Sequence, residues 1–260
     1  MTGLEEAAQM IERYVRPDTF PLAVRVERDV SRIPEKARRP KRDLGASLSI
    51  CQGVSIARRY GWTLAMSGED LSCPIAQVAF GFEEPSSSYR KGTLAEGMYA
   101  KDHEAALATE KAVAGIDPDA SGVVLIGPLA RSRFEPEVIV IYGNSAQVMV
   151  MVAAALWRKG GAITSQFSGR ADCAEIINRT RQTGLPQVIL PCYGDRVFGQ
   201  TQDHEMAFSL PYDGLDDFLS GLEGTSRGGV RYPIPHYLRY QAHYPATYEK
   251  VMDEFEARRS

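Results

Sequence analysis

Two apolar runs that follow each other directly in the chain constrain its fold more than any other feature. Residues 138–142 form a strand-like run, and residues 145–158 form a run with the length of a helix. The turn signal Tyr142-Gly143-Asn144-Ser145 separates them, so neither run reaches the roughly 18 apolar residues that a membrane span needs. Because the second run is apolar nearly all round, it predicts a central helix that is buried on several sides.

Strand-like runs and helical patterns share the rest of the chain. The predicted strands cover residues 22–26, 62–66, 123–126, 138–142, 163–167, 187–190 and 206–210. The predicted helices cover residues 3–16, 51–59, 74–80, 103–114, 145–158, 171–182, 212–222 and 247–258. No helical pattern separates the strands that begin at Val123 and Val138, whereas helices separate the later ones. We therefore predict an α/β or α+β fold with a mixed β-sheet flanked by helices.

We predict that residues 1–260 form one compact domain. A chain of this length buries enough apolar surface to fold without disulfides, and it contains no internal repeat or low-complexity tract. The final stretch, residues 227–260, begins with a segment dense in aromatic residues and prolines, which are poorly suited to hang free in water. We interpret this stretch as an aromatic strap across the body, followed by a helix.

Composition and charge argue against several classes of function. The chain is 44% hydrophobic and 24% charged, and its 30 basic and 33 acidic side chains give a net charge of −3. This balance gives no general case for nucleic-acid binding, and we expect no membrane association. The acidic, amphipathic N-terminus is unlike a secretory signal, so we expect a cytoplasmic protein with reduced cysteines. The sequence contains no P-loop, H-E-x-x-H or G-x-S-x-G pattern.

The four cysteines are the sharpest candidates for chemistry. Each is predicted at a strand end or at the N-terminus of a helix, and together they are Cys51, Cys73, Cys173 and Cys192. At such a position free amide groups and the helix dipole stabilise a thiolate and lower the pKa of the thiol. Four thiolates could hold a metal, and iron–sulfur clusters accept cysteines of this kind. None of the four belongs to a C-x-x-C pair, so buried structural thiols and a reactive thiol stay open as alternatives.

Polar residues gather directly after the predicted strand 187–190, where sheets with helices usually place their sites. The candidate catalytic residues of this segment are Asp195, Arg196, Asp203 and His204. Strand parity predicts His204 on the same face as Met206, and Asp203 and Glu205 on the other face. His204 could act as a base or proton donor beside Asp195 or Asp203, or it could be a hydrogen-bonded core residue.

Two further residues are candidates for binding a cofactor or substrate. Arg170, in Ser168-Gly169-Arg170, could offer a guanidinium fork to a carboxylate or phosphate, as could the arginines of residues 227–232. Gln52 directly follows Cys51 and is one of the nearest polar side chains in the sequence. The segment Gly143-Asn144-Ser145-Ala146-Gln147 could face an anion with its free amides, although ordinary helix capping is the simpler interpretation.

Six strings of residues resemble the uncharacterised ArCR family, which is named for archaeal cysteine-rich proteins. They are Leu48-Ser49-Ile50-Cys51-Gln52, Trp62-Thr63-Leu64, Glu69-Asp70-Leu71-Ser72-Cys73-Pro74, Gly143-Asn144-Ser145-Ala146-Gln147, Leu190-Pro191-Cys192-Tyr193-Gly194-Asp195-Arg196 and Arg231-Tyr232-Pro233-Ile234-Pro235. The resemblance extends from about Pro21 to Tyr248. It includes three of the four cysteines, with Cys173 outside the strings, and the name of the family implies that the cysteines act together at a metal or iron–sulfur site.

This resemblance and the helix positions together favour an iron–sulfur protein. We expect Cys51, Cys73, Cys173 and Cys192 to hold one cluster of the 4Fe-4S type, with a zinc ion as an alternative. Such a cluster passes electrons to a partner when cysteines bind all its irons, or acts as a Lewis acid when one iron is open. A cluster-dependent redox enzyme or lyase that acts on a small anionic or aromatic molecule is the favoured hypothesis, although the sequence does not decide that the chain is an enzyme.

A metal-free binding or regulatory domain is the competing hypothesis. In that case the cysteines are structural, and a pocket is lined by arginines and by the aromatic residues of the tail. These aromatic residues are Tyr232, His236, Tyr237 and Tyr240. The substitution Cys73→Ser separates the two hypotheses, because it removes a cluster ligand in one and costs a modest packing penalty in the other.

Overall fold

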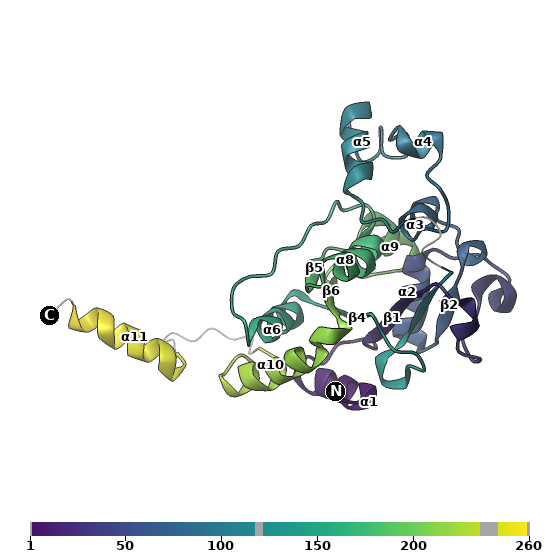
Figure 1. The fold of residues 1–260 in the computed structure, drawn as a ribbon. Helices are drawn as coiled ribbons and strands as arrows, with labels where there is room; N and C mark the ends of the chain where they lie inside the picture. Colours follow the sequence, from purple (N-terminus) through teal and green to yellow (C-terminus); the bar gives the residue numbers. More distant parts are fainter. Residues whose placement is uncertain (1, 118–121, 235–243, 259–260) are drawn as a thin grey trace.

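The computed structural model describes residues 2–117, 122–234 and 244–258, and an antiparallel sheet forms its centre (Figure 1). Within that part of the chain the strands are β1 (Leu22–Glu27), β2 (Leu64–Met66), β3 (Val123–Pro128), β4 (Val138–Gly143), β5 (Gln187–Ile189) and β6 (Met206–Pro211). Their order is β2-β3-β1-β4-β6-β5, and each neighbouring pair is antiparallel. The predicted sheet flanked by helices is confirmed, and the antiparallel ladders make the fold α+β.

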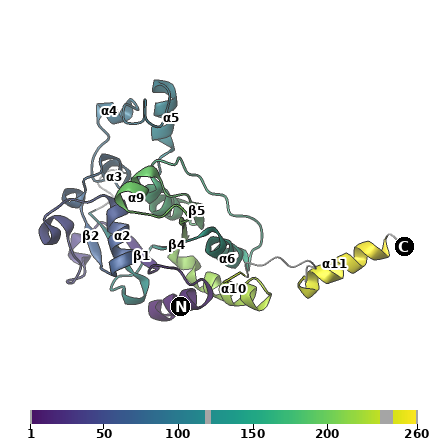
Figure 2. The ribbon, with the colours of Figure 1, turned by 180° about the vertical axis from the view of Figure 1, so that it is seen from behind.

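Helices cover both faces of the sheet. Successive strand residues point to opposite faces, and the side chains on each face are apolar. Val140 and Tyr142 of β4 belong to one core cluster, and Ile139 and Ile141 belong to the other. The first face carries α2 (Ile50–Tyr60), α3 (Pro74–Ala79), α7 (Asp172–Ala174), α8 (Thr180–Thr183) and α9 (Tyr193–Phe198). The second face carries α1 (Leu4–Tyr14), α6 (Ser145–Leu156) and α10 (Leu215–Arg227). Figure 2 shows the same three layers from behind.

The apolar helix predicted at residues 145–158 is α6, which packs against α10 and against β4 and β6. It is buried on these sides, but Met149 on its remaining side is exposed. Short helical turns complete the described chain: 3-10 turns at Val30–Arg32, Gly68–Asp70, Leu129–Arg131 and Tyr212–Gly214, and π-helical turns at Pro40–Leu44 and Glu175–Arg179. The second π-helical turn joins α7 to α8, so residues 172–183 form one continuous helical segment, as the sequence predicts.

One predicted strand is wrong. Residues 163–167 form no strand, and Phe167 is exposed. The segment runs past the edge of the sheet at β5, where the Ser165 hydroxyl accepts a hydrogen bond from the amide of Val188 at 2.8 Å. A side chain therefore occupies the place where a ladder of backbone hydrogen bonds would begin.

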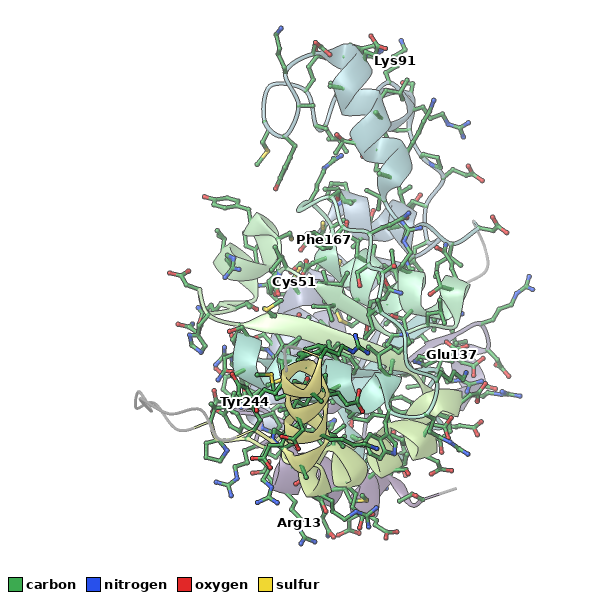
Figure 3. The ribbon with its side chains drawn as sticks, turned by 90° about the vertical axis from the view of Figure 1, so that its left-hand side faces the viewer. Arg13, Cys51, Lys91, Glu137, Phe167 and Tyr244 are labelled. Carbon is green, nitrogen blue, oxygen red and sulfur yellow. The ribbon has the colours of Figure 1, made fainter. Side chains whose placement is uncertain are left out.

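Two helical parts extend beyond the layered body. An arm of residues 83–113 carries α4 (Ser87–Arg90) and α5 (His103–Ala112) and projects from the first face (Figures 1 and 3). At the other end of the chain, the described side chains of α11 (Ala246–Ala257) are exposed, and the helix lies apart from the body in both ribbon views. The predicted strap lies partly outside the described residues, since 235–243 are not among them. No helix in the described ranges is long and apolar enough to cross a membrane.

Candidate metal centre

All four cysteines lie at the N-termini of helices, as the sequence predicts. Cys51 is the second residue of α2, whose N-cap is Ser49, and Cys173 is the second residue of α7. Cys73 and Cys192 are the N-cap residues of α3 and α9. Each cysteine lies where a loop leads into a helix on the first face of the sheet. The local residues that start these helices therefore also place the thiols on one side of the sheet.

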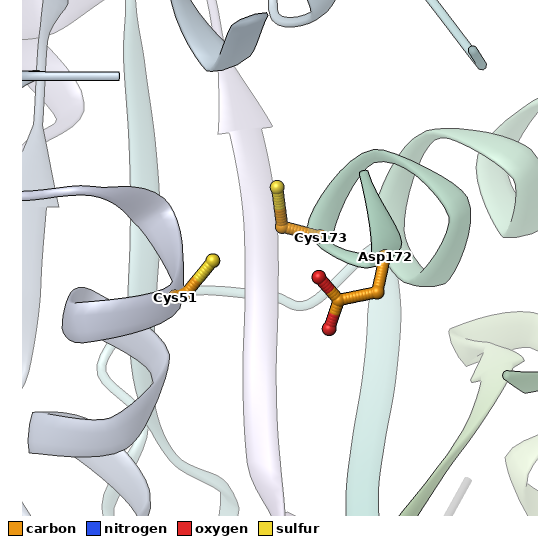
Figure 4. Close-up of side chains that lie close together, drawn as sticks. All are labelled: Cys51, Asp172 and Cys173. Atoms are coloured by element: carbon orange, nitrogen blue, oxygen red, sulfur yellow. The ribbon is translucent and has the colours of Figure 1, made fainter. Parts of the chain in front are cut away.

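Three of the thiols and one carboxylate come together. Cys51, Asp172 and Cys173 are buried, and their ligand atoms all lie within 4.8 Å of one another (Figure 4). Cys192 donates a hydrogen bond from its sulfur to Asp172 Oδ1 at 2.9 Å, and its thiol also forms a hydrogen bond with the thiol of Cys51. Cys73 is half-buried and packs against the same core cluster. We call Cys51, Cys73, Asp172, Cys173 and Cys192 the cysteine cluster.

A second buried carboxylate adjoins this cluster. Asp195, on α9, shares a hydrogen bond with Asp172. The Asp195 Oδ2 atom accepts hydrogen bonds from the Tyr142 hydroxyl at 3.1 Å and from Thr201 Oγ1 at 2.8 Å. The candidate catalytic residue Asp195 therefore lies in the site, where it joins the cysteine cluster to the end of β4.

A buried ion pair lies next to Thr201 and Tyr142, the two residues that bond to Asp195. Arg58 of α2 pairs with Glu205, and its Nη2 atom donates to Thr201 Oγ1 at 3.1 Å. The Arg58 guanidinium also lies over the ring of Tyr142, 4.1 Å from its centroid. Both charged side chains are almost completely buried. Glu205 also pairs with Arg59 at 3.2 Å, whereas removing Glu205 would leave the Arg58 charge buried without a counterion. The pair therefore fixes α2 against the segment that follows α9.

The electrostatics of the cysteine cluster oppose a thiolate when no cation is present. Burial raises the pKa of Asp172 well above its usual range, helped by Asp195, and burial also raises the pKa of Asp195. The hydrogen bond from Cys51 lowers the pKa of Cys173, but burial and nearby negative charge outweigh it and raise that pKa to about 11. Thiol hydrogen bonding within the cluster raises the pKa of Cys51 and of Cys192.

The predicted lowering of the thiol pKa values is therefore wrong for these three cysteines. Each helix N-terminus contributes only a fraction of a positive charge, whereas the cluster crowds several groups that become negative on ionisation into a buried space. A bound cation would reverse this balance, because metal ions bind thiolates and displace their protons.

Arg170 lies beside the cysteine cluster, two residues before Asp172. Its side chain is fully buried and forms an ion pair with Glu110 of α5. Its guanidinium lies over the ring of Tyr99, 5.6 Å from the centroid. The Nε and Nη2 atoms of Arg170 find no hydrogen-bond partner in the described ranges. This is a buried cation with spare donors, at the place where the arm meets the site.

The other predicted site residues lie elsewhere. The Gln52 amide oxygen accepts a bond from the Ser49 amide at 2.8 Å and so completes a capping box of α2. Arg196 donates to the Gln202 carbonyl at 2.9 Å, and its ion-pair contact with the exposed Asp203 is long, at 3.9 Å. His204 is exposed. The predicted strand parity does not apply to His204 and Glu205, because both residues precede β6; Glu205 is the buried one.

Sequence reasoning missed Asp172, Arg58 and the residues that connect them. Asp172 had a signal, since it directly precedes Cys173 at a predicted helix start. Arg58 also had one, because it continues the spacing of the buried residues Ile50, Val54 and Ala57 along α2. A charged residue on the apolar side of a helix indicates a buried ion pair, although the sequence cannot name Glu205 as its partner.

Fold and site together define an α+β protein with a buried cluster of cysteines and carboxylates at helix N-termini. The chain belongs to the uncharacterised ArCR family, whose model matches residues 10–221. It is also 26% identical over 222 residues to the uncharacterized protein MJ0308 of Methanocaldococcus jannaschii. The matched region covers 84% of this chain and 93% of that protein. No solved structure matches the chain. The resemblance seen in the sequence motifs is thus confirmed.

Proposed function

We propose that this protein binds an iron–sulfur cluster of the 4Fe-4S type through Cys51, Cys73, Cys173 and Cys192. The observation that carries the proposal is the convergence of cysteines from four helix N-termini: Cys51 contacts both Cys173 and Cys192, and Cys73 lies near enough to Cys173 for its charge to affect that thiol. Thiolates are the ligands that such clusters use. The group Cys51, Asp172 and Cys173 supports a metal site more generally, because soft sulfur and carboxylate oxygen both bind transition metals.

The buried sulfur and oxygen atoms of the site suit a bound cation better than they suit a hydrophobic core without one. Asp172 Oδ2 and Asp195 Oδ1 are buried and have no hydrogen-bond donor among the described groups, apart from a proton that the two carboxyls share. Buried polar atoms without partners are costly. A metal or cluster beside Asp172 would compensate this carboxylate together with the thiolates.

The proposed role is redox chemistry, or cluster-assisted chemistry, on a small anionic or aromatic molecule. When bound, the cluster would supply an electron carrier, or a Lewis acid if one of its irons lacks a cysteine. Arg170 supports an anionic molecule, since its buried guanidinium has donors to spare and lies two residues before Asp172 in the chain. The chain's own contribution would be to orient that anion and, through the paired carboxyls of Asp172 and Asp195, to hold a proton next to it.

Purification without oxygen tests the proposal directly. We expect broad visible absorption, with about four irons and four acid-labile sulfides per chain, after purification or reconstitution with iron and sulfide. The variants Cys73→Ser and Cys173→Ser should each lose most of this absorption. Ser72→Ala, at the exposed residue beside Cys73, is the matched control and should keep it. Colourless protein without iron after reconstitution would contradict the proposal.

A single zinc ion is the second candidate, and one observation favours it. The ligand atoms of Cys51, Asp172 and Cys173 lie close enough together to bind one ion, and Cys192 bonds to the same carboxylate. Four such ligands match the tetrahedral preference of zinc. Colourless protein with about one zinc per chain, lost in Cys173→Ser, would support zinc and contradict the cluster.

A further inference from the structure

A pocket lies on the opposite face of the sheet from the cysteine cluster. It has a volume of about 300 Å³, and its walls come from the end of α1, from α6, from α10 and from the segment after α10. In Figure 3, Arg13 marks this part of the molecule, at the end opposite Lys91 of the arm, and Cys51 lies between the two. The pocket is therefore independent of the candidate metal centre.

Among the described residues, three arginines line this pocket and no acidic residue does. The arginines are Arg13, Arg16 and Arg231, and the other walls include Tyr14 and Tyr232. None of the three guanidiniums forms an ion pair within the described ranges. Residues 235–243, which follow in the sequence and lie outside those ranges, contain no Asp or Glu. The chain thus gathers three positive charges here although its net charge is −3.

Side-chain amides of the segment 143–147 hold two walls of the pocket in place. The buried Gln147 donates from Nε2 to the carbonyl of Arg16 at 2.6 Å, where Arg16 adopts a left-handed φ of 53°. Asn144 donates from Nδ2 to the Tyr232 hydroxyl at 3.3 Å, which leaves the hydroxyl proton free to point at a ligand. On the third wall, Arg231 Nε donates to the carbonyl of Ser226 at 2.8 Å. These bonds fix the backbone of Arg16, the ring of Tyr232 and the guanidinium of Arg231 before any ligand arrives.

We propose that this pocket binds a small organic phosphate. Three guanidiniums around one hollow suit a group with two negative charges and several acceptor oxygens, because each fork can donate two parallel hydrogen bonds to it. The apolar residues Val150, Leu222 and Val230 complete the lining and would contact the organic part of the ligand. A volume of about 300 Å³ is at the lower end for small-molecule sites, so the ligand is of the size of a phosphorylated metabolite or a mononucleotide.

Calorimetric titration at low salt tests the proposal, with AMP, inorganic pyrophosphate, adenosine and succinate as probes. We expect AMP and pyrophosphate to bind, and we expect adenosine and succinate to bind at least tenfold more weakly. Arg13→Ala and Arg231→Ala should each weaken AMP binding about tenfold or more. The matched control is Arg227→Ala, an exposed arginine on α10 that pairs with Glu223 outside the pocket, and it should bind like the parent chain.

Three outcomes would overturn the proposal: no binding of either phosphate probe, equal binding of succinate, or the same loss in Arg227→Ala as in Arg231→Ala. The last would indicate charge attraction without a site. Cys51→Ser separates this proposal from the metal site, because a variant that cannot load metal should still bind AMP with unchanged affinity. If Cys51→Ser abolished AMP binding, the phosphate site would have to be assigned to the cysteine cluster instead.

Discussion

At the scale of single residues, the candidate metal centre depends on close approach between α2 and α9. Gly199, directly after α9, lies against Asp195 and against the carbonyl of Cys51. A Cβ atom at this position would overlap Asp195 Oδ1 and lie 2.8 Å from the Asp195 carbonyl. The absence of a side chain at Gly199 is therefore what allows Asp195 to sit beside Asp172 and Cys51.

Gly199→Ala should displace Asp195 and separate it from Asp172. We expect a loss of about 2–4 kcal/mol in the free energy of unfolding, because the overlap is with a backbone atom and a buried carboxylate. Metal loading should fall as well. The matched control is Gly194→Ala on the same helix, where a new Cβ would make an ordinary 3.7 Å contact with the Cys192 sulfur. Urea unfolding of both variants measures the difference, and equal stabilities would contradict the role given to Gly199.

At the scale of secondary-structure elements, local signals predicted most of the fold, and contacts between elements supplied the rest. Local residues such as Ser49 and Pro74 predict the N-termini of the helices that carry the four cysteines. Elements with such local signals can be predicted from the sequence. The strand order was not visible, because β1 pairs with β3 and β4 through contacts distant in sequence. The same limit hid Arg58–Glu205 and Asp172–Asp195, whose partners no local pattern connects.

The arm of residues 83–113 shows how one contact between elements can decide an arrangement. Glu110 of α5 is the carboxylate that pairs with the buried Arg170. Tyr89 of α4 lies close to the same pair, and burial together with the Glu110 charge raises the pKa of Tyr89 to about 12. This small polar junction joins the arm to the edge of the cysteine cluster.

Glu110→Gln should loosen the arm, because it leaves the Arg170 charge buried without a counterion, at a cost of about 3–5 kcal/mol. We expect a protease to cut within residues 83–113 at least tenfold faster than in the parent chain, while the remaining body stays resistant. Glu104→Gln, an exposed position in the first turn of the same helix, is the control. Unchanged cleavage in Glu110→Gln would show that the arm is held by other contacts.

At the scale of the whole molecule, the cysteine cluster joins parts of the chain that are far apart in sequence. Its members come from α2, α3, α7 and α9, between Cys51 and Cys192. A metal that binds the folded chain and not the unfolded one stabilises the entire first face of the sheet by mass action. The protonation of the same groups makes this stabilisation depend on pH, because the metal and the protons compete for the cluster.

The metal-free and the metal-loaded protein should respond to pH in opposite directions. In the metal-free chain, burial raises the pKa of Asp172 and Asp195, so the folded state holds more protons than the unfolded state above about pH 4. The raised pKa of Cys173, about 11, extends this effect into the alkaline range above about pH 8. Stability without metal is therefore greatest at acid pH with respect to these groups and falls as the pH rises.

Metal binding reverses the sign, because each bound thiolate has released its proton and the apparent affinity increases with pH. We expect the gain in melting temperature on loading to be larger at pH 8 than at pH 6, and we expect Asp172→Asn to flatten the decline of the metal-free chain by about 1–3 kcal/mol at pH 8. Asp203→Asn, at a fully exposed carboxylate, is the control and should follow the parent chain. Thermal unfolding of each protein at both pH values, with and without metal, gives one slope for the loaded and one for the metal-free state. Parallel slopes for loaded and metal-free protein would mean that the metal binds away from Asp172 and the buried thiols.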